Sequence, residues 1–99
     1  MVTPLRFEWD PAKAVANVQK HGVTFSEART AFADDRALVL DDPDHSGAED
    51  RFILLGLSAW LRLLVVVHVS LESDSVVRII SARRATPSER AQYGAQWKP

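Results

Sequence analysis

The stretch at residues 76–93 constrains the fold most strongly, because it specifies a strand, a helix and the turn between them. Residues 76–83 alternate in the pattern of a β-strand. The segment TPSE at 86–89 then supplies an N-cap threonine, a proline at the first helical position and the glutamate of a capping box. We therefore expect the turn that carries Arg83 and Arg84 to be held in one conformation. Fixed guanidinium groups at a strand end suit a phosphate.

Capping signals and periodicity predict the remaining elements. Asp10 and Pro11 begin a first helix that Gly22 ends, and Thr24 with Glu27 forms a second capping box at the start of another helix. Strands are expected at 7–9, 37–40, 51–57, 61–69 and 76–83, and a third helix at 86–95. This order predicts an α+β fold, with an antiparallel β-sheet and helices packed on one face, two of them N-terminal and one C-terminal.

Length and composition bound the class of protein. The 99 residues fit a single domain, 1–99, with one modest core. The absence of cysteine excludes a disulfide framework and a zinc–thiolate site, in agreement with a reducing compartment. The longest apolar run, at 63–67, is far shorter than the roughly 20 residues of a membrane span. We expect a soluble, cytoplasmic protein.

The formal net charge of −1 hides an uneven distribution. Residues 1–50 contain five Lys and Arg against ten Asp and Glu, whereas residues 51–99 contain seven against three. Such an asymmetry is typical of a chain whose basic half meets a polyanion. The alternative is that the two halves pair with each other.

The strand at 61–69 predicts a polar surface on one side of the sheet. Its wholly apolar face consists of Leu63, Val65, Val67 and Val69. The other face carries Arg62 and His68 at its ends. If Arg78 on the next strand points the same way, a concave surface with arginine and histidine forms. Alternatively, His68 is a partly buried structural residue, and Arg78 only pairs with a carboxylate on an adjacent strand.

An acidic segment at 41–45 invites a metal hypothesis, because oxygen and imidazole ligands fall close together there. The residues are Asp41, Asp42, Asp44 and His45. A solvated acidic loop is the favoured reading, and we predict no metal site and no cofactor.

Four segments share a pattern that extends over nearly the whole chain. They are FEWDPAKAVANVQKHGVTFSEA at 7–28, DDPDHSGAEDRFILLGLS at 41–58, LRLLVVVHVSLE at 61–72 and RIISARRATPSER at 78–90. The signatures FEWD and KHGV near the start, with RIISAR and ER near the end, are long and specific. In these segments the chain resembles the BrnT toxins.

The resemblance implies a type II toxin with a RelE-like fold and a metal-independent endoribonuclease activity that inhibits translation. It also implies a cognate antitoxin, BrnA-like, that binds the toxin and represses the shared promoter through its own DNA-binding domain. The substrate would be RNA, with or without the ribosome, and DNA would be contacted only through the antitoxin. The alternative is a catalytically weak relative that serves as a co-repressor.

Metal-free RNA cleavage requires activation of the ribose 2′-hydroxyl, stabilisation of the phosphorane and protonation of the leaving oxygen. Arginine suits the phosphorane, and histidine or glutamate can transfer the proton. The predicted catalytic residues are His68, Glu72, Arg78 and Arg83. The predicted RNA-binding residues are Lys20, Arg62 and Arg84.

Two features of the sequence count against these assignments. Family members usually carry an arginine directly after the glutamate that Glu72 matches, whereas this chain has Ser73. Phosphate binding is then weakened or is taken over by Arg62. Lys20 and His21 are also explained by favourable charge at the end of a helix.

Overall fold

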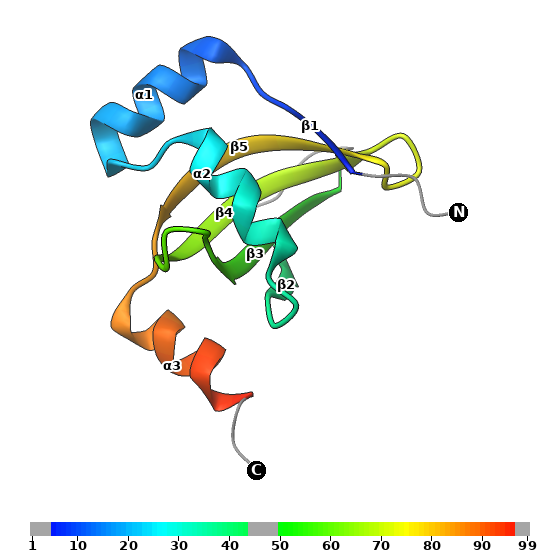
Figure 1. Cartoon of the computed structure of the whole chain (residues 1–99). Coiled ribbons are helices and arrows are strands. Elements are labelled where there is room, and N and C mark those ends of the chain that lie inside the picture. The colour runs from blue at the N-terminus through cyan, green and yellow to red at the C-terminus, as the bar shows by residue number, and fades with distance from the viewer. Residues whose placement is uncertain (1–4, 44–49, 97–99) are drawn as a thin grey trace.

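A computed structural model describes residues 5–43 and 50–96 of the protein. Its central element is a five-stranded sheet with the strand order β1-β5-β4-β3-β2 (Figure 1). The elements are β1 (Arg6–Glu8), α1 (Pro11–His21), α2 (Phe25–Thr30), the 3₁₀ helix η1 (Ala31–Ala33), β2 (Leu38–Asp41), β3 (Arg51–Leu57), β4 (Leu63–Leu71), β5 (Val76–Arg84) and α3 (Pro87–Ala95). The predicted strands and the first and third predicted helices are confirmed within two residues at each end, and the second helix begins at Phe25, directly after the predicted cap Thr24. The 3₁₀ helix η1 was not predicted.

The sheet is mixed, so the prediction of a purely antiparallel sheet is wrong. β1 pairs with β5 in parallel, with Phe7 opposite Val77, and the other three strand pairs are antiparallel. A short turn forces two consecutive strands to run antiparallel. β1 has no such turn to β5, because α1 and α2 carry the chain across the sheet from one edge strand to the other.

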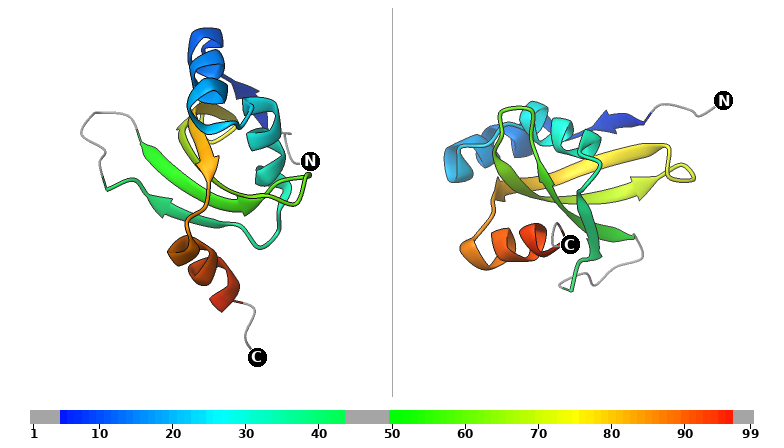
Figure 2. Two further views of the ribbon diagram at one scale, coloured as in Figure 1. Left: turned by 90° about the vertical axis from the view of Figure 1, so that its left-hand side faces the viewer. Right: turned by 60° about the horizontal axis from the view of Figure 1, so that its bottom comes forward.

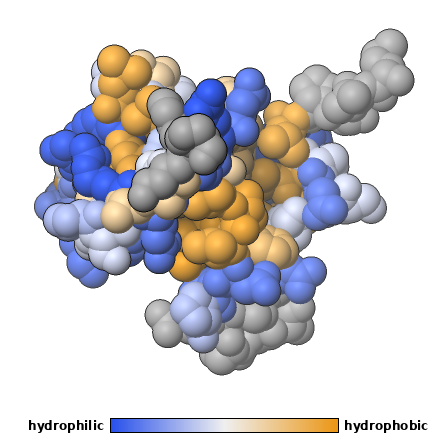
Figure 3. Space-filling view, turned by 90° about the horizontal axis from the view of Figure 1, so that it is seen from below, coloured by the Kyte–Doolittle hydropathy of each residue, from blue (hydrophilic) through white to orange (hydrophobic). Residues whose placement is uncertain are grey.

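Helices cover both faces of the sheet, so the prediction of one covered face is also wrong (Figure 2). α2 packs over Leu64 and Val66 of β4 and α1 lies against β5, whereas Tyr93 of α3 packs on Leu63 and Val65. Alternate side chains of a strand point to opposite faces, and β4 is apolar on both. α3 covers only part of its face, and apolar surface remains visible beside it when the molecule is seen from below (Figure 3).

The predicted caps of α1 and α3 are confirmed. Asp10 accepts a hydrogen bond from the Ala12 amide, and Gly22 adopts the left-handed conformation at φ 70°. Thr86 and Glu89 form both hydrogen bonds of the capping box. The chain therefore leaves β5 and enters α3 along a defined path.

A side-chain amide joins α1 to the edge of β5. Asn17 is the buried residue of α1, at 5% exposure, whereas Val15 and Val18 are 60% and 43% exposed. Its Nδ2 donates to the carbonyl oxygens of Ala82 and Val23, both at 2.8 Å, and its Oδ1 accepts from the Ala82 amide at 3.0 Å. Because β1 pairs with β5 only as far as Arg78, this amide satisfies backbone groups that no neighbouring strand reaches.

We expect Asn17→Ala to lower the free energy of unfolding by about 2–3 kcal/mol, because three buried backbone groups would lose their partner. Urea denaturation measures the change. Gln19→Ala, on the exposed side of the same helix, is the matched control and should change the stability by less than about 0.5 kcal/mol. Equal effects of the two substitutions would contradict the role given to the amide.

Candidate nucleic-acid interface

Basic side chains gather where α1 packs against β5. A cavity of about 200 Å³ lies between the two elements, and Ile80 and Ser81 of β5 form one of its walls. The opposite wall consists of Lys13, Ala16, Asn17, Lys20 and His21. Together with three arginines from β5 and the start of β4, these cations define a surface that we call the basic edge. Its members are Lys13, Lys20, His21, Arg62, Arg83 and Arg84.

The helix supplies its part of the basic edge through spacing. Successive polar residues on this side of α1 are four, three and one positions apart, which places them on one face of the helix: Lys13, Asn17, Lys20 and His21. Asn17 at the centre of that face is fixed to β5, so the cations beside it are carried to the strand. Lys13 was not singled out in the sequence and His21 was attributed to the end of the helix, although their spacing around a polar Asn17 was a detectable signal.

The side chain of Arg62, the residue just before β4, reaches the turn between α1 and α2, where the buried carboxylate of Glu27 holds it. Its Nε donates to Oε2 of Glu27 at 2.8 Å, and its Nη2 donates to the other carboxylate oxygen and to the Gly22 carbonyl. Ser58 Oγ also donates a hydrogen bond to Glu27. The hydrogen bond from Arg62, together with the bond from Ser58, holds the pKa of Glu27 below its ordinary value. The predicted second capping box is therefore only half right. Thr24 accepts from the Glu27 amide, but the carboxylate turns to Arg62.

Arg84 lies beside Arg62, because it is paired with Leu64 at the start of β4. Its positive charge also contributes to the lowered pKa of Glu27. Within residues 5–43 and 50–96, the exposed side chains of Lys13, Lys20 and Arg84 form no ion pair. These three cations are available to an anionic ligand.

Arg83 projects from the other face of β5 and is held by α3. Its Nη1 and Nη2 donate to the two carboxylate oxygens of Glu89, each at 2.9 Å. Glu89 also accepts from the Thr86 amide at 2.8 Å, and the bond from Arg83 is the main cause that lowers the pKa of Glu89 to about 2. The capping-box glutamate thus holds Arg83 in place, whereas Arg84, which was expected to be held as well, is exposed and forms no ion pair among the described residues.

His68 lies in the core and not on a polar surface. It is 5% exposed, its ring centroid lies 4.9 Å from that of Phe32, and its Nδ1 lies 3.1 Å from the Val66 carbonyl oxygen. Burial lowers the pKa of His68. The core position predicted as the alternative for this residue is the one observed.

The concave surface expected to join His68 to Arg78 does not form. The pairing of β4 with β5 is irregular after Val67, and Ile80 is left without a partner. One extra residue in a strand moves the following side chains to the other face. Arg78 consequently stands opposite Val69, on the face of the sheet away from His68.

Glu72 and Arg78 lie toward the other end of β5. Glu72 is in the turn after β4, with φ 49°, and accepts a hydrogen bond from Arg6 at 2.6 Å. Arg78 Nε donates to Glu8 at 2.8 Å. Arg78 precedes Arg83 by five positions, roughly 16 Å along β5. Four of the seven predicted residues therefore lie toward the same end of β5: Lys20, Arg62 and Arg84 on the side of α1 and α2, and Arg83 on the opposite face of the sheet.

No three His, Cys, Asp or Glu side chains of the described residues are grouped so that they could hold a metal ion. Of the acidic segment singled out in the sequence, Asp41 ends β2 and Asp42 follows it, while Asp44 and His45 lie outside the described residues. None of the helices in residues 5–43 and 50–96 is long and apolar enough to cross a membrane.

The sequence and the fold were both compared with those of known proteins. Residues 9–89 match the family described as the ribonuclease toxin, BrnT, of type II toxin–antitoxin systems. The 1.1 Å crystal structure of the Brucella abortus ribonuclease toxin, BrnT, has a similar fold, with a TM-score of 0.62 and 23% identity. The alignment covers 83% of this chain and 97% of that one. The search of curated proteins gave no match. Because the family match spans most of the sequence, the chain belongs to the BrnT family of ribonuclease toxins.

Proposed function

We propose that this protein is the toxin of a type II toxin–antitoxin pair and that it cleaves RNA at the basic edge without a metal ion, which inhibits translation. The observation that carries the proposal is the gathering of Lys20, Arg62, Arg83 and Arg84 around the end of β5. Cations that contact phosphates supply most of the sequence-independent affinity for RNA. Side chains of arginine and histidine can provide charge stabilisation and proton transfer.

Arg83 is the proposed ligand of the phosphate that is cleaved. A guanidinium group has five N–H donors, and three hydrogen bonds, two to Glu89 and one to the Arg84 carbonyl, leave further donors for a phosphate oxygen. Because Glu89 fixes the orientation of the group, Arg83 would not need to be reorganised as negative charge develops on the phosphorane.

His21 is the proposed proton-transfer residue. It is half-buried at the α1–β5 cavity beside Ser81, whereas His68 is enclosed by aromatic rings. A histidine side chain that lines a solvent-accessible cavity can act as a general acid or base on a bound ligand. In this proposal Lys13, Lys20 and Arg84 bind neighbouring phosphates, and His68, Glu72 and Arg78 have structural roles.

The proposed partner is a BrnA-like antitoxin, in keeping with a family of type II toxins. A RelE-like relationship of the fold and action on ribosome-bound messenger RNA remain predictions from the resemblance. A second candidate function, a weakly active or inactive co-repressor, is favoured by Ser73 and by the carboxylates that already pair with Arg62 and Arg83.

Cleavage of a labelled RNA by the purified protein in excess EDTA tests the activity. We expect wild type to cleave, and Arg83→Ala and His21→Gln each to lower the rate at least about 100-fold, the usual effect of losing a charge-stabilising or proton-transfer group. Arg90→Ala, an exposed arginine of α3 outside the basic edge, is the control and should cleave like wild type.

The results that would contradict this proposal differ in meaning. Full activity of His21→Gln with loss of activity in a folded His68→Gln variant would reverse the assignment of the histidines. No cleavage by wild type, with or without added ribosomes, would favour the co-repressor.

The Arg83–Glu89 pair should make stability depend on acid pH. The pKa of Glu89 is about 2 in the folded protein against an ordinary value of 4.5, so the pair stabilises the fold above pH 4.5. That stabilisation is lost as the pH falls from 4.5 toward 2. Urea unfolding should show the largest destabilisation by Glu89→Gln near pH 7 and a smaller one at pH 3. The same difference at both values would contradict the pairing.

A further inference from the structure

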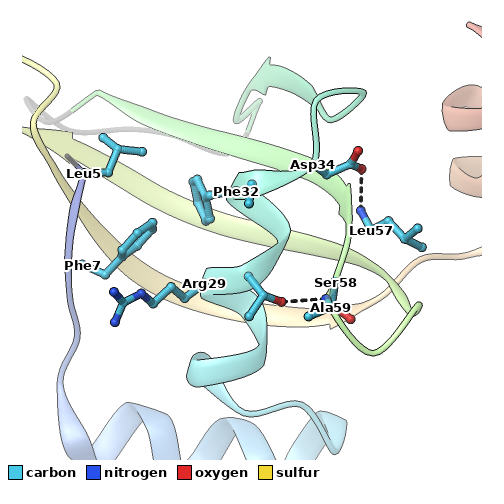
Figure 4. Close-up of a pocket in the computed structure, with 10 residues that line it drawn as sticks. Leu5, Phe7, Arg29, Phe32, Asp34, Leu57, Ser58 and Ala59 are labelled. Atoms are coloured by element: carbon cyan, nitrogen blue, oxygen red, sulfur yellow. Dashed lines mark hydrogen bonds between the residues drawn. The ribbon is translucent and has the colours of Figure 1, made fainter. Parts of the chain in front are cut away.

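A groove apart from the basic edge lies between β1, the α2–η1 segment and the turn that joins β3 to β4 (Figure 4). Its volume is about 690 Å³. The apolar side chains that line it are Leu5, Phe7, Phe32, Ala33, Leu57 and Ala59. Phe7 and Phe32 pack edge to face with ring centroids 5.1 Å apart, so the floor of the groove is aromatic.

Three of the polar side chains in the groove wall already form hydrogen bonds within the protein. Thr30 Oγ1 accepts from the Ala59 amide and donates to the Glu27 carbonyl. Asp34 accepts from the Leu57 amide and the Tyr93 hydroxyl, and Ser58 Oγ donates to the Glu27 carboxylate. These groups maintain the walls and offer little to a ligand.

Arg29 is the exception. Its guanidinium carbon lies 5.1 Å above the centroid of the Phe7 ring, and the side chain is exposed. Among residues 5–43 and 50–96 it has no carboxylate partner. The groove therefore combines an aromatic floor with one exposed cation that lies over it and can pair with an anion.

The turn at the end of the groove exposes two apolar side chains on a backbone that is held by hydrogen bonds. Trp60 and Leu61 are 63% and 79% exposed, and Leu61 has a positive φ of 62° that a non-glycine residue seldom adopts. Ser58 holds the turn. Its carbonyl accepts from the Leu61 amide, and its Oγ lies within hydrogen-bond distance of the amides of Trp60 and Arg62. An exposed tryptophan is a residue type that is enriched among the anchors of protein interfaces.

We propose that this groove binds an apolar segment of the antitoxin that carries a carboxylate for Arg29, an inference that rests on the proposed function. RNA fits the groove poorly, because a single cation stands over an aromatic floor there, whereas several cations line the basic edge. A peptide with apolar side chains would fill the floor, and a glutamate or aspartate would pair with Arg29.

The position of the groove also explains how such a segment would neutralise the toxin. Ser58 and Ala59 line its end, and the Arg62 amide donates to Ser58 Oγ at 3.3 Å. The side chain of Arg62 belongs to the basic edge. A bound segment that continues past Ala59 and Trp60 therefore reaches the surface proposed to bind RNA.

Isothermal titration of the full-length toxin with the purified protein encoded by the adjacent gene tests this assignment. We expect Arg29→Glu to weaken binding at least tenfold through charge reversal, and Ala59→Gln to weaken it similarly by filling the groove without a charge change. Arg90→Glu, the same charge reversal on exposed α3, is the control and should bind like wild type. RNA cleavage should be unchanged in Arg29→Glu and Ala59→Gln.

The two proposals fail in different ways. Wild-type affinity in both groove variants, or no binding by the wild-type toxin, would overturn the groove assignment. Absence of RNA cleavage by wild type would overturn the proposed activity, whereas a selective loss of binding in the groove variants would still support the docking site.

Discussion

The pairing of Asn17 with Ala82 is the interaction on which the arrangement of the candidate site depends. A side-chain amide carries a donor and an acceptor in the same geometry as a peptide group, so Asn17 takes the place of a strand neighbour along the edge of β5. The same contact fixes the rotation of α1 about its axis. As a result, Lys13, Lys20 and His21 face the strand while the valines of the helix remain exposed.

Two carboxylates organise the arginines around this contact. Glu27 and Glu89 each stand at the third position of a helix and each hold one arginine of the basic edge through two hydrogen bonds. A buried carboxylate such as Glu27 is tolerated because it is paired and hydrogen-bonded, and removal of Arg62 alone would leave it uncompensated. The charge of each pair is largely cancelled, so the net positive charge of this surface comes from Lys13, Lys20 and Arg84, which form no ion pair among the described residues.

One extra residue in β5 decides which polar side chains can act together. The irregularity at Ile80 turns Arg78 away from the face of His68, and packing of the histidine against Phe32 and Phe52 completes the separation. The alternation patterns of the two neighbouring strands therefore did not predict that the side chains of His68 and Arg78 lie on opposite faces of the sheet. Such an irregularity leaves no clear mark in the sequence, because Ile80 suits a regular strand equally well.

The sequence by itself determined the local structure of this protein. Caps such as Asp10, Gly22 and Thr86, and the runs of aliphatic and β-branched residues in β3, β4 and β5, specify elements through residues a few positions apart. Only the tertiary structure decided the parallel pairing of β1, the face that α3 covers and the partner of the Glu27 carboxylate. Each of these depends on residues far apart in the chain, whose meeting follows from packing both apolar faces of one sheet.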